Sequence, residues 1–284
     1  MLLPLIFATV ATYANPPAGT ISQLPPEILD RKAIEAKKRA SQATGPTYAT
    51  PRSAGCMDEM SASPAAGAMA AQKALDRAVG PARARAGLCL GIALGEMGRW
   101  DEARTAFVNA RDAAAVSDSA SRARLGAMAG NAALAAGSAG TALPILDTAF
   151  ADAKAAGDPE LSGTVALDRA RALVALGQQA QAGQALADAR AATPNSPQAW
   201  LLSATLSRRQ NLLSDAQAQI ERAAQLATDD PEVGLEAGVI AMLSGREEAA
   251  RKSWRSVLAL SPGSDAAATA KGYLAQLDAG AAAP

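Results

Sequence analysis

The sequence predicts an all-α protein built as a solenoid of antiparallel helix hairpins. Residues 197–230 and 231–264 carry the same pattern of small, bulky and turn-forming residues, and the two copies are 34 positions apart. Stacked helix–turn–helix repeats have a period of this length. Alanine makes up about a quarter of the 284 residues and aromatic residues only 3%, which favours helices that pack closely through small side chains.

Three further copies precede the two clear ones. The five copies begin at residues 84, 123, 163, 197 and 231, so the successive spacings are 39, 40, 34 and 34. The two longer spacings place about half a dozen extra residues near 115–121 and near 157–162. We expect those residues to form longer loops or extended helix ends.

Each repeat has a small residue at its eighth and twentieth positions, where the two helices of a hairpin cross. The fifteenth position is Gly98, Gly137, Gly177, Asn211 or Gly245, and Gly and Asn are the residues that best tolerate a left-handed helix end. The three tryptophans occupy three different large-residue positions: Trp200 the fourth, Trp100 the seventeenth and Trp254 the twenty-fourth.

This pattern resembles the tetratricopeptide repeat family. The first repeat carries the family's most typical residues, namely Leu90-Gly91, Gly98, Ala103 and Phe107. The resemblance covers residues 84–264 and implies a right-handed superhelical solenoid of about five repeats with capping helices at both ends. In this family the inner, concave face usually holds an extended peptide or a helix of a partner protein.

The flanking segments are predicted from helix start signals. Ser63-Pro64 combines a capping residue with a proline suited to the first helical turn, and the same device recurs at Asp158-Pro159, Ser196-Pro197 and Asp230-Pro231. We therefore expect an N-terminal helix over 65–79, within a segment 63–83, that ends at Gly80-Pro81. A last helix over about 265–277, within the segment 265–284, would cover the end of the solenoid.

The first 62 residues differ in composition from the rest. Residues 1–14 are apolar and end in small residues, which predicts a cleaved export signal and a periplasmic or secreted protein of a Gram-negative bacterium. No Lys or Arg precedes Arg31, so a start codon assigned too late, a weak membrane anchor or an N-terminal artefact are the alternatives. Residues 15–62 are predicted to be a mostly disordered linker with one helix near 26–41.

Composition argues against several functions. The 27 basic and 27 acidic side chains cancel, so no nucleic-acid-binding surface is expected. The chain has no histidine, which excludes Ser-His-Asp triads, Cys-His pairs and His-ligated metal sites. Acid pairs at Asp101-Glu102, Asp229-Asp230 and Glu247-Glu248 lie at predicted helix N-termini, where the helix dipole stabilises negative charge. We expect no cofactor, no metal and no catalysis.

The resemblance implies which residues line the concave face, because the family uses the second, fifth, ninth, twelfth and thirteenth positions of each first helix. The candidate partner-binding residues are Arg85, Leu88, Ile92, Arg124, Asn131, Leu167, Arg171, Leu201, Thr205, Arg208, Leu235 and Val239. The four arginines suit a partner carboxylate or acidic segment; the alternative is that they form the solvated edge of each helix.

Cys56 and Cys89 are the only cysteines. In an exported protein they could form a disulfide that holds the linker against the first repeat; the alternative is two free thiols. The leading functional prediction is a protein–protein interaction scaffold that binds a partner peptide or helix and contacts membranes only peripherally if at all. The alternative is an accessory component of cell-envelope assembly machinery, associated with the outer membrane or cell wall.

Overall fold

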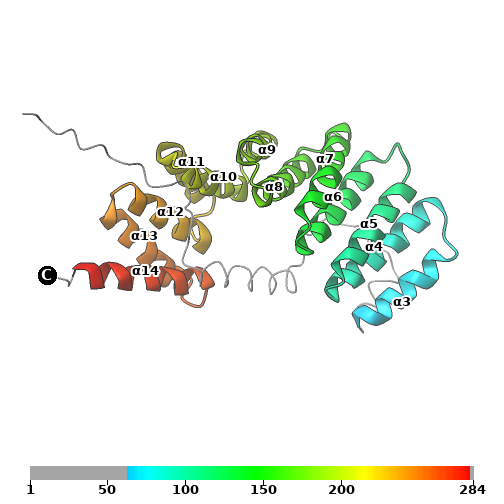
Figure 1. Ribbon diagram of the computed structural model, residues 1–284, viewed down its shortest axis with the longest axis horizontal. Helices are drawn as coiled ribbons and strands as arrows, with labels where there is room; N and C mark the ends of the chain where they lie inside the picture. The colour runs from blue at the N-terminus through cyan, green and yellow to red at the C-terminus, as the bar shows by residue number, and fades with distance from the viewer. Residues whose placement is uncertain (1–62, 282–284) are drawn as a thin grey trace, which may run out of the picture.

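The computed structural model describes residues 63–281, and all regular structure in this range is α-helical. The predicted signal and linker lie outside the described residues. Twelve helices follow one another in the described range (Figure 1). They are α3 (Pro64–Leu75), α4 (Gly80–Glu96), α5 (Trp100–Ala113), α6 (Ser119–Ala135), α7 (Ala139–Ala155), α8 (Pro159–Ala175), α9 (Gln179–Ala192), α10 (Pro197–Arg209), α11 (Leu213–Leu226), α12 (Pro231–Leu243), α13 (Glu247–Leu260) and α14 (Asp265–Ala281).

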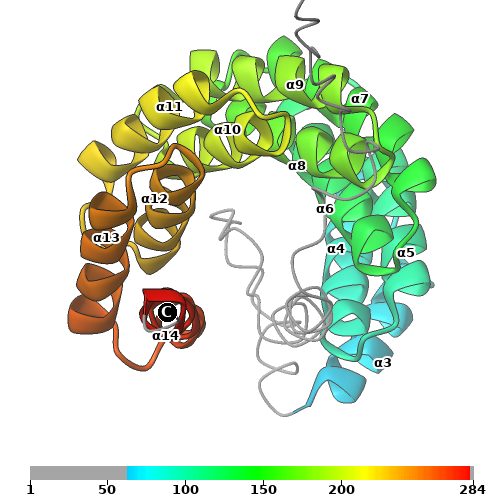
Figure 2. The ribbon, with the colours of Figure 1, turned by 60° about the vertical axis from the view of Figure 1, so that its left-hand side comes forward.

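Five hairpins, α4–α5 to α12–α13, form repeats one to five and stack in chain order. Figure 2 shows that the stack curves into an arc. The first helix of each hairpin lies on the inner side of the arc and the second helix on the outer side. The predicted all-α solenoid of helix hairpins is thus confirmed, with α3 packed on α4 and α14 packed on α13 and α12.

The predicted capping residues open their helices as expected. Ser63, Asp158, Ser196 and Asp230 each accept a hydrogen bond from a backbone N–H in the first turn, and a proline follows each of them. The cap satisfies a backbone donor that has no partner within the helix, and the proline has no N–H to satisfy. These four positions therefore fix where α3, α8, α10 and α12 begin.

The first repeat begins earlier than the sequence pattern suggested. Gly80-Pro81 was expected to end the N-terminal helix, but α3 already ends at Leu75 and Gly80-Pro81 opens α4. A proline in the first turn initiates a helix as readily as it terminates the preceding one. Helices α6 and α8 also begin four residues before the predicted repeat starts, at Ser119 and Pro159. The extra residues in repeats one to three therefore add one helical turn to each first helix.

The fifteenth position of every repeat has the predicted left-handed backbone. The φ angles of its four glycines, Gly98, Gly137, Gly177 and Gly245, lie between 71° and 74°. Asn211 takes the same position in repeat four with φ 61°, and no other non-glycine residue in the described range has a positive φ. This conformation ends the first helix and reverses the chain within two or three residues.

The core of each hairpin pairs a small residue at the eighth position with a large one at the twenty-fourth. A Cβ atom added to Gly91 would lie 2.4 Å from the Phe107 ring, and one added to Gly130 would lie 2.4 Å from Leu146. Alanines at the twentieth position, from Ala103 to Ala250, are fully buried. Small side chains therefore let the two helices approach, and a single large side chain fills the space between them.

The three tryptophans are not equally buried. Trp254 is 3% exposed, whereas Trp100 and Trp200 are half-buried. The Trp200 indole Nε1 donates to the Pro194 carbonyl oxygen at 2.9 Å, and the Arg190 guanidinium lies 5.2 Å from the ring centroid. Trp200 therefore contacts repeat three as well as its own repeat, and only in repeat five does a tryptophan occupy the space between the two helices of its hairpin.

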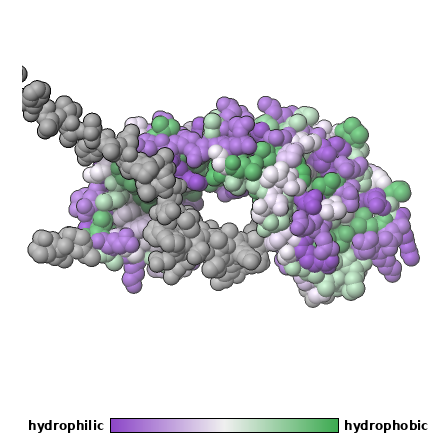
Figure 3. Space-filling model, viewed as in Figure 1, coloured by the Kyte–Doolittle hydropathy of each residue, from purple (hydrophilic) through white to green (hydrophobic). Residues whose placement is uncertain are grey.

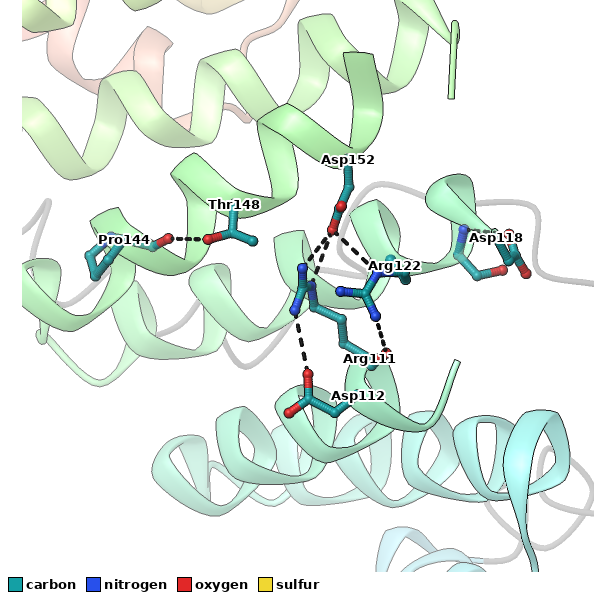
Figure 4. A network of polar contacts seen from close by, with 8 residues as sticks. Arg111, Asp112, Asp118, Arg122, Pro144, Thr148 and Asp152 are labelled. Carbon is teal, nitrogen blue, oxygen red and sulfur yellow. Dashed lines mark hydrogen bonds and ion pairs between the residues drawn. The ribbon is translucent and has the colours of Figure 1, made fainter. Parts of the chain in front are cut away.

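Neighbouring repeats are also joined by an ion-pair network between α5, α6 and α7 (Figure 4). The Arg111 guanidinium donates to Asp152 Oδ2 from both Nε, at 3.2 Å, and Nη2, at 2.7 Å. Arg122 lies 3.9 Å from the same carboxylate oxygen and donates to the Arg111 carbonyl oxygen. Because these side chains are at most 20% exposed, the network fixes how repeat two sits on repeat one.

Helix α14 ends the solenoid and runs to Ala281, beyond the expected end near Leu277. Ala266, Ala267 and Ala270 of α14 share a hydrophobic cluster with Trp254, and the Trp254 and Tyr273 rings lie 5.0 Å apart. Helix α14 therefore covers the apolar side of repeat five, which has no further repeat to pack against. Among the described helices none has the length and apolar character needed to span a membrane.

Candidate functional site

The inner side of the arc is the candidate interaction surface. It is formed by α4, α6, α8, α10 and α12, the five helices on which the sequence placed its partner-binding residues (Figure 2). On the face of the molecule shown in Figure 3, hydrophilic residues alternate with small apolar areas rather than gathering into one patch.

The predicted apolar residues of this surface differ in how much of them a partner could touch. Leu88, Ile92 and Leu201 are half-buried and pack on the hydrophobic clusters of their own repeats. Leu167 is only 5% exposed. Leu235 and Val239 pack against the cluster that includes α14, so the C-terminal end of the inner side is partly occupied by the chain itself.

Three of the four predicted arginines pair with carboxylates of the chain. Arg208 makes a bidentate contact with Glu236 on α12, at 2.6 and 3.3 Å, and both side chains are about 15% exposed. Arg124 lies 3.5 Å from Asp158. Arg171 donates to Asp168 and keeps 42% of its side chain exposed. Arg85 is exposed and has no ion pair among the described residues.

The two predicted polar residues lie in different repeats, Asn131 in repeat two and Thr205 in repeat four. Asn131 on α6 donates from Nδ2 to Asp168 Oδ2 of α8 at 2.8 Å, so it links two repeats and holds a carboxylate in place. Thr205 is half-buried on α10. The structure thus brings Asn131 and Arg171 together around Asp168, which was not among the predicted site residues.

Among the residues that the structure describes, Asp168 is the one fully buried acid, with 1% exposure. Burial raises the pKa of its carboxyl above the ordinary value of 3.8, against the opposing effects of Arg171 and Asn131. Its sixth position in the repeat is not one that the family pattern assigns to the concave face. The sequence did contain a signal for this residue, namely an acid on a helix whose other buried residues are mostly apolar.

The raised pKa of Asp168 predicts how stability depends on pH. Above pH 3.8 the unfolded chain releases this proton before the folded protein does, so the folded state binds more protons and loses stability as pH rises towards its higher pKa. The Asp168→Asn variant lacks this titration. We expect the stability of the wild type relative to Asp168→Asn, measured by urea unfolding from pH 4 upward, to fall with pH. A relative stability that rises with pH would contradict the assignment.

A cavity of about 340 Å³ opens beside Asp168, between α8 and the chain that enters α10. Its lining has five residues from one face of α8 and three from the segment 193–198. They are Glu160, Thr164, Leu167, Asp168, Arg171, Thr193, Ser196 and Gln198. The cavity thus joins repeats three and four, and it contains Leu167 and Arg171 of the predicted binding residues.

Other candidate chemistry is not supported as a site. In the described range no three His, Cys, Asp or Glu residues are grouped so that they could hold a metal ion. The acid pairs lie in the first turns of α5 and α13 and at the start of α12, as expected. Cys89 is buried and disulfide-bonded. Because Cys56 lies outside the described residues, its pairing with Cys89 stays a prediction, to be checked by mass after alkylation with and without reductant.

Comparison with known proteins identifies the fold through structure alone. No protein-family model matches the sequence, and no curated protein sequence matches it either. Solved structures do match. The type IV pilus biogenesis factor PilW is 20% identical with a TM-score of 0.60, over 75% of this chain and 94% of PilW. PilF of Pseudomonas aeruginosa is 16% identical with a TM-score of 0.59, over 84% of this chain and 98% of PilF.

The description of a third match names the repeat. YrrB, described as a TPR protein with an unusual peptide-binding site, is 18% identical with a TM-score of 0.51, over 72% of this chain and 99% of YrrB. The helix hairpins, the left-handed turn at the fifteenth position and these structural matches agree with one another. The chain therefore has the tetratricopeptide-repeat fold.

Proposed function

We propose that this protein is a non-catalytic scaffold that binds a segment of a partner protein on the inner side of its arc. The observation that carries the proposal is the surface itself. Half-buried apolar side chains lie on α4 and α10, and a polar cavity opens at α8. Extended peptides or helices bind to surfaces that combine apolar contacts with a few fixed polar groups. The peptide-binding site described for YrrB supports this use of the fold.

An acidic group on the partner is a finer part of the proposal. Its support rests mainly on Arg85, because Arg124 and Arg208 already pair with carboxylates of the chain. A partner carboxylate would gain a charge-assisted hydrogen bond from Arg85 without displacing an existing ion pair. We therefore assign the acidic group to the α4 end of the inner surface.

A role in cell-envelope assembly is the second candidate function. Two observations favour it: the fold is similar to that of the pilus biogenesis factor PilW, and residues 1–14 have the composition of an export signal. In this version of the proposal the protein is periplasmic or secreted and its partner belongs to an envelope complex. Cell fractionation tests it, since a full-length product confined to the cytoplasm would contradict it.

Site-specific photo-crosslinking tests the binding surface. Gln198 borders the inner cavity and Gln184 lies on the outer helix α9, and both are exposed. A photoreactive residue at position 198 is expected to capture one partner reproducibly, while the same residue at position 184 captures none. The bulky Thr205→Arg change on α10 should abolish the adduct at position 198. Capture from position 184 alone would place the interaction on the outer face and contradict the proposal.

A further inference from the structure

The cavity between α8 and α10 is lined along one side by a row of oxygen acceptors. Glu160, Thr164 and Asp168 are four residues apart and lie on one face of α8, with about 6 Å of helix rise between successive members. Thr193 and Ser196 face the row from the segment that enters α10. Five oxygen-bearing side chains from two repeats therefore surround the same space.

The two threonine hydroxyls use their hydrogens within the fold. Thr164 Oγ1 donates to the Glu160 carbonyl oxygen at 2.8 Å, and Thr193 Oγ1 donates to the Ala189 carbonyl oxygen at 2.9 Å. A hydroxyl that has given its hydrogen to a carbonyl has only lone pairs left. Both threonines consequently act as acceptors towards a molecule in the cavity.

The charges around the cavity also favour a cation. Asp168 and Arg171 form an ion pair and neutralise each other. Glu160 is exposed and has no ion pair among the described residues. The lining therefore carries a net charge of −1. The unpaired carboxylate of Glu160 and the Thr164 hydroxyl are its available acceptors.

The cavity also lies at the junction between repeats three and four. Fewer backbone positions of α9 and α10 come close to each other than in any other pair of consecutive described helices. The volume of about 340 Å³ would hold about ten water molecules, so a long side chain fits without displacing either repeat. A group bound here would contact both repeats at once.

We propose that this cavity receives a basic side chain, arginine or lysine, of the partner segment. Its cationic head is held by Glu160, with Thr164 and Thr193 accepting its remaining hydrogens, and its aliphatic stem lies along Leu167. This inference rests on the proposed function, since the segment must first lie on the inner surface. It differs from the acidic group assigned to Arg85 in both the sign of the charge and the repeat that binds it.

Selection from a phage-displayed library of random decapeptides on the full chain tests the inference. Peptides enriched on the wild type are expected to carry Arg or Lys at one position. On the Glu160→Arg variant that preference should reverse towards Asp or Glu, while the control Glu248→Arg on α13 should leave it unchanged. Replacing the enriched arginine by uncharged citrulline should weaken binding to the wild type about tenfold or more, and should not weaken binding to Glu160→Arg.

The other outcomes overturn one proposal or both. Peptides that bind the wild type, lose binding to Thr205→Arg and show no basic position would overturn the basic-side-chain inference and leave the proposed function standing. An acidic preference that Arg171→Gln removes would overturn it as well and assign the cavity to a carboxylate. No enrichment on the wild type over Thr205→Arg would overturn the proposed function and this inference with it. Thermal melting of each variant shows that loss of binding is not loss of the fold.

Discussion

Replacing Trp254 by alanine is expected to lower the free energy of unfolding of the C-terminal repeats by about 3–5 kcal/mol. The indole is 3% exposed, its Nε1 donates to the Leu235 carbonyl oxygen at 3.2 Å, and its ring packs on Tyr273 of α14. Alanine would leave a cavity between α12, α13 and α14 and would remove the indole hydrogen bond to the Leu235 carbonyl oxygen, which keeps its partner within α12. Urea unfolding followed by circular dichroism measures the loss.

A second variant shows whether the effect comes from the proposed pairing of small and large residues. A Cβ atom on Gly238 would lie 2.1 Å from Trp254 Nε1, so Gly238→Ala should destabilise the wild type by overpacking, by about 1–3 kcal/mol. In a Trp254→Leu background the smaller side chain leaves room, and the same change should cost much less. If Gly238→Ala costs the same free energy in both backgrounds, the two positions do not face each other.

Breaking the Arg208–Glu236 pair is expected to cost about 2–4 kcal/mol, because each single change leaves the other charge largely buried without its partner. The two side chains are 15% and 14% exposed and make two contacts. Arg208→Met and Glu236→Leu should each be clearly destabilising, whereas the double variant should lose less than either single one. Equilibrium unfolding of the four proteins completes the cycle.

This prediction separates a structural arginine from a binding one. If Arg208 were a solvated donor kept for a partner, Arg208→Met would leave stability unchanged within about 0.5 kcal/mol and would weaken partner binding. A destabilised Arg208→Met, rescued by Glu236→Leu, would place this residue in the packing of repeat four on repeat five. Charge reversal at Arg208 is therefore a poor test of binding, and Arg85 is the better position.

The fold was predictable because each of its determinants is local in the sequence. A capping Ser or Asp followed by proline specifies a helix start within two residues, and a Gly or Asn at the fifteenth position specifies a left-handed turn. Even Asn211, which departs from glycine, adopts φ 61°. The start of α4 was misread because a Gly-Pro pair can either end or begin a helix, and only packing in the tertiary structure decides between them.

The site was harder to predict because its polar contacts join residues that are far apart in the sequence. Asn131 and Asp168 are 37 residues apart and Arg208 and Glu236 are 28 apart, so each pair bridges two repeats. The family pattern assigns positions within one repeat and says nothing of such partners. It consequently placed its candidate residues on the inner helices, but it treated Arg208 as available to a ligand and passed over the buried Asp168.

Hydrogen–deuterium exchange on the full chain, with and without a peptide selected on the wild type, tests most directly whether the inner side of the arc is the binding surface. The account predicts that bound peptide slows exchange in α8 and α10, and to a lesser extent in α4 and α6, while the outer helices α5, α7, α9 and α11 exchange as before. Protection confined to the outer helices would contradict it.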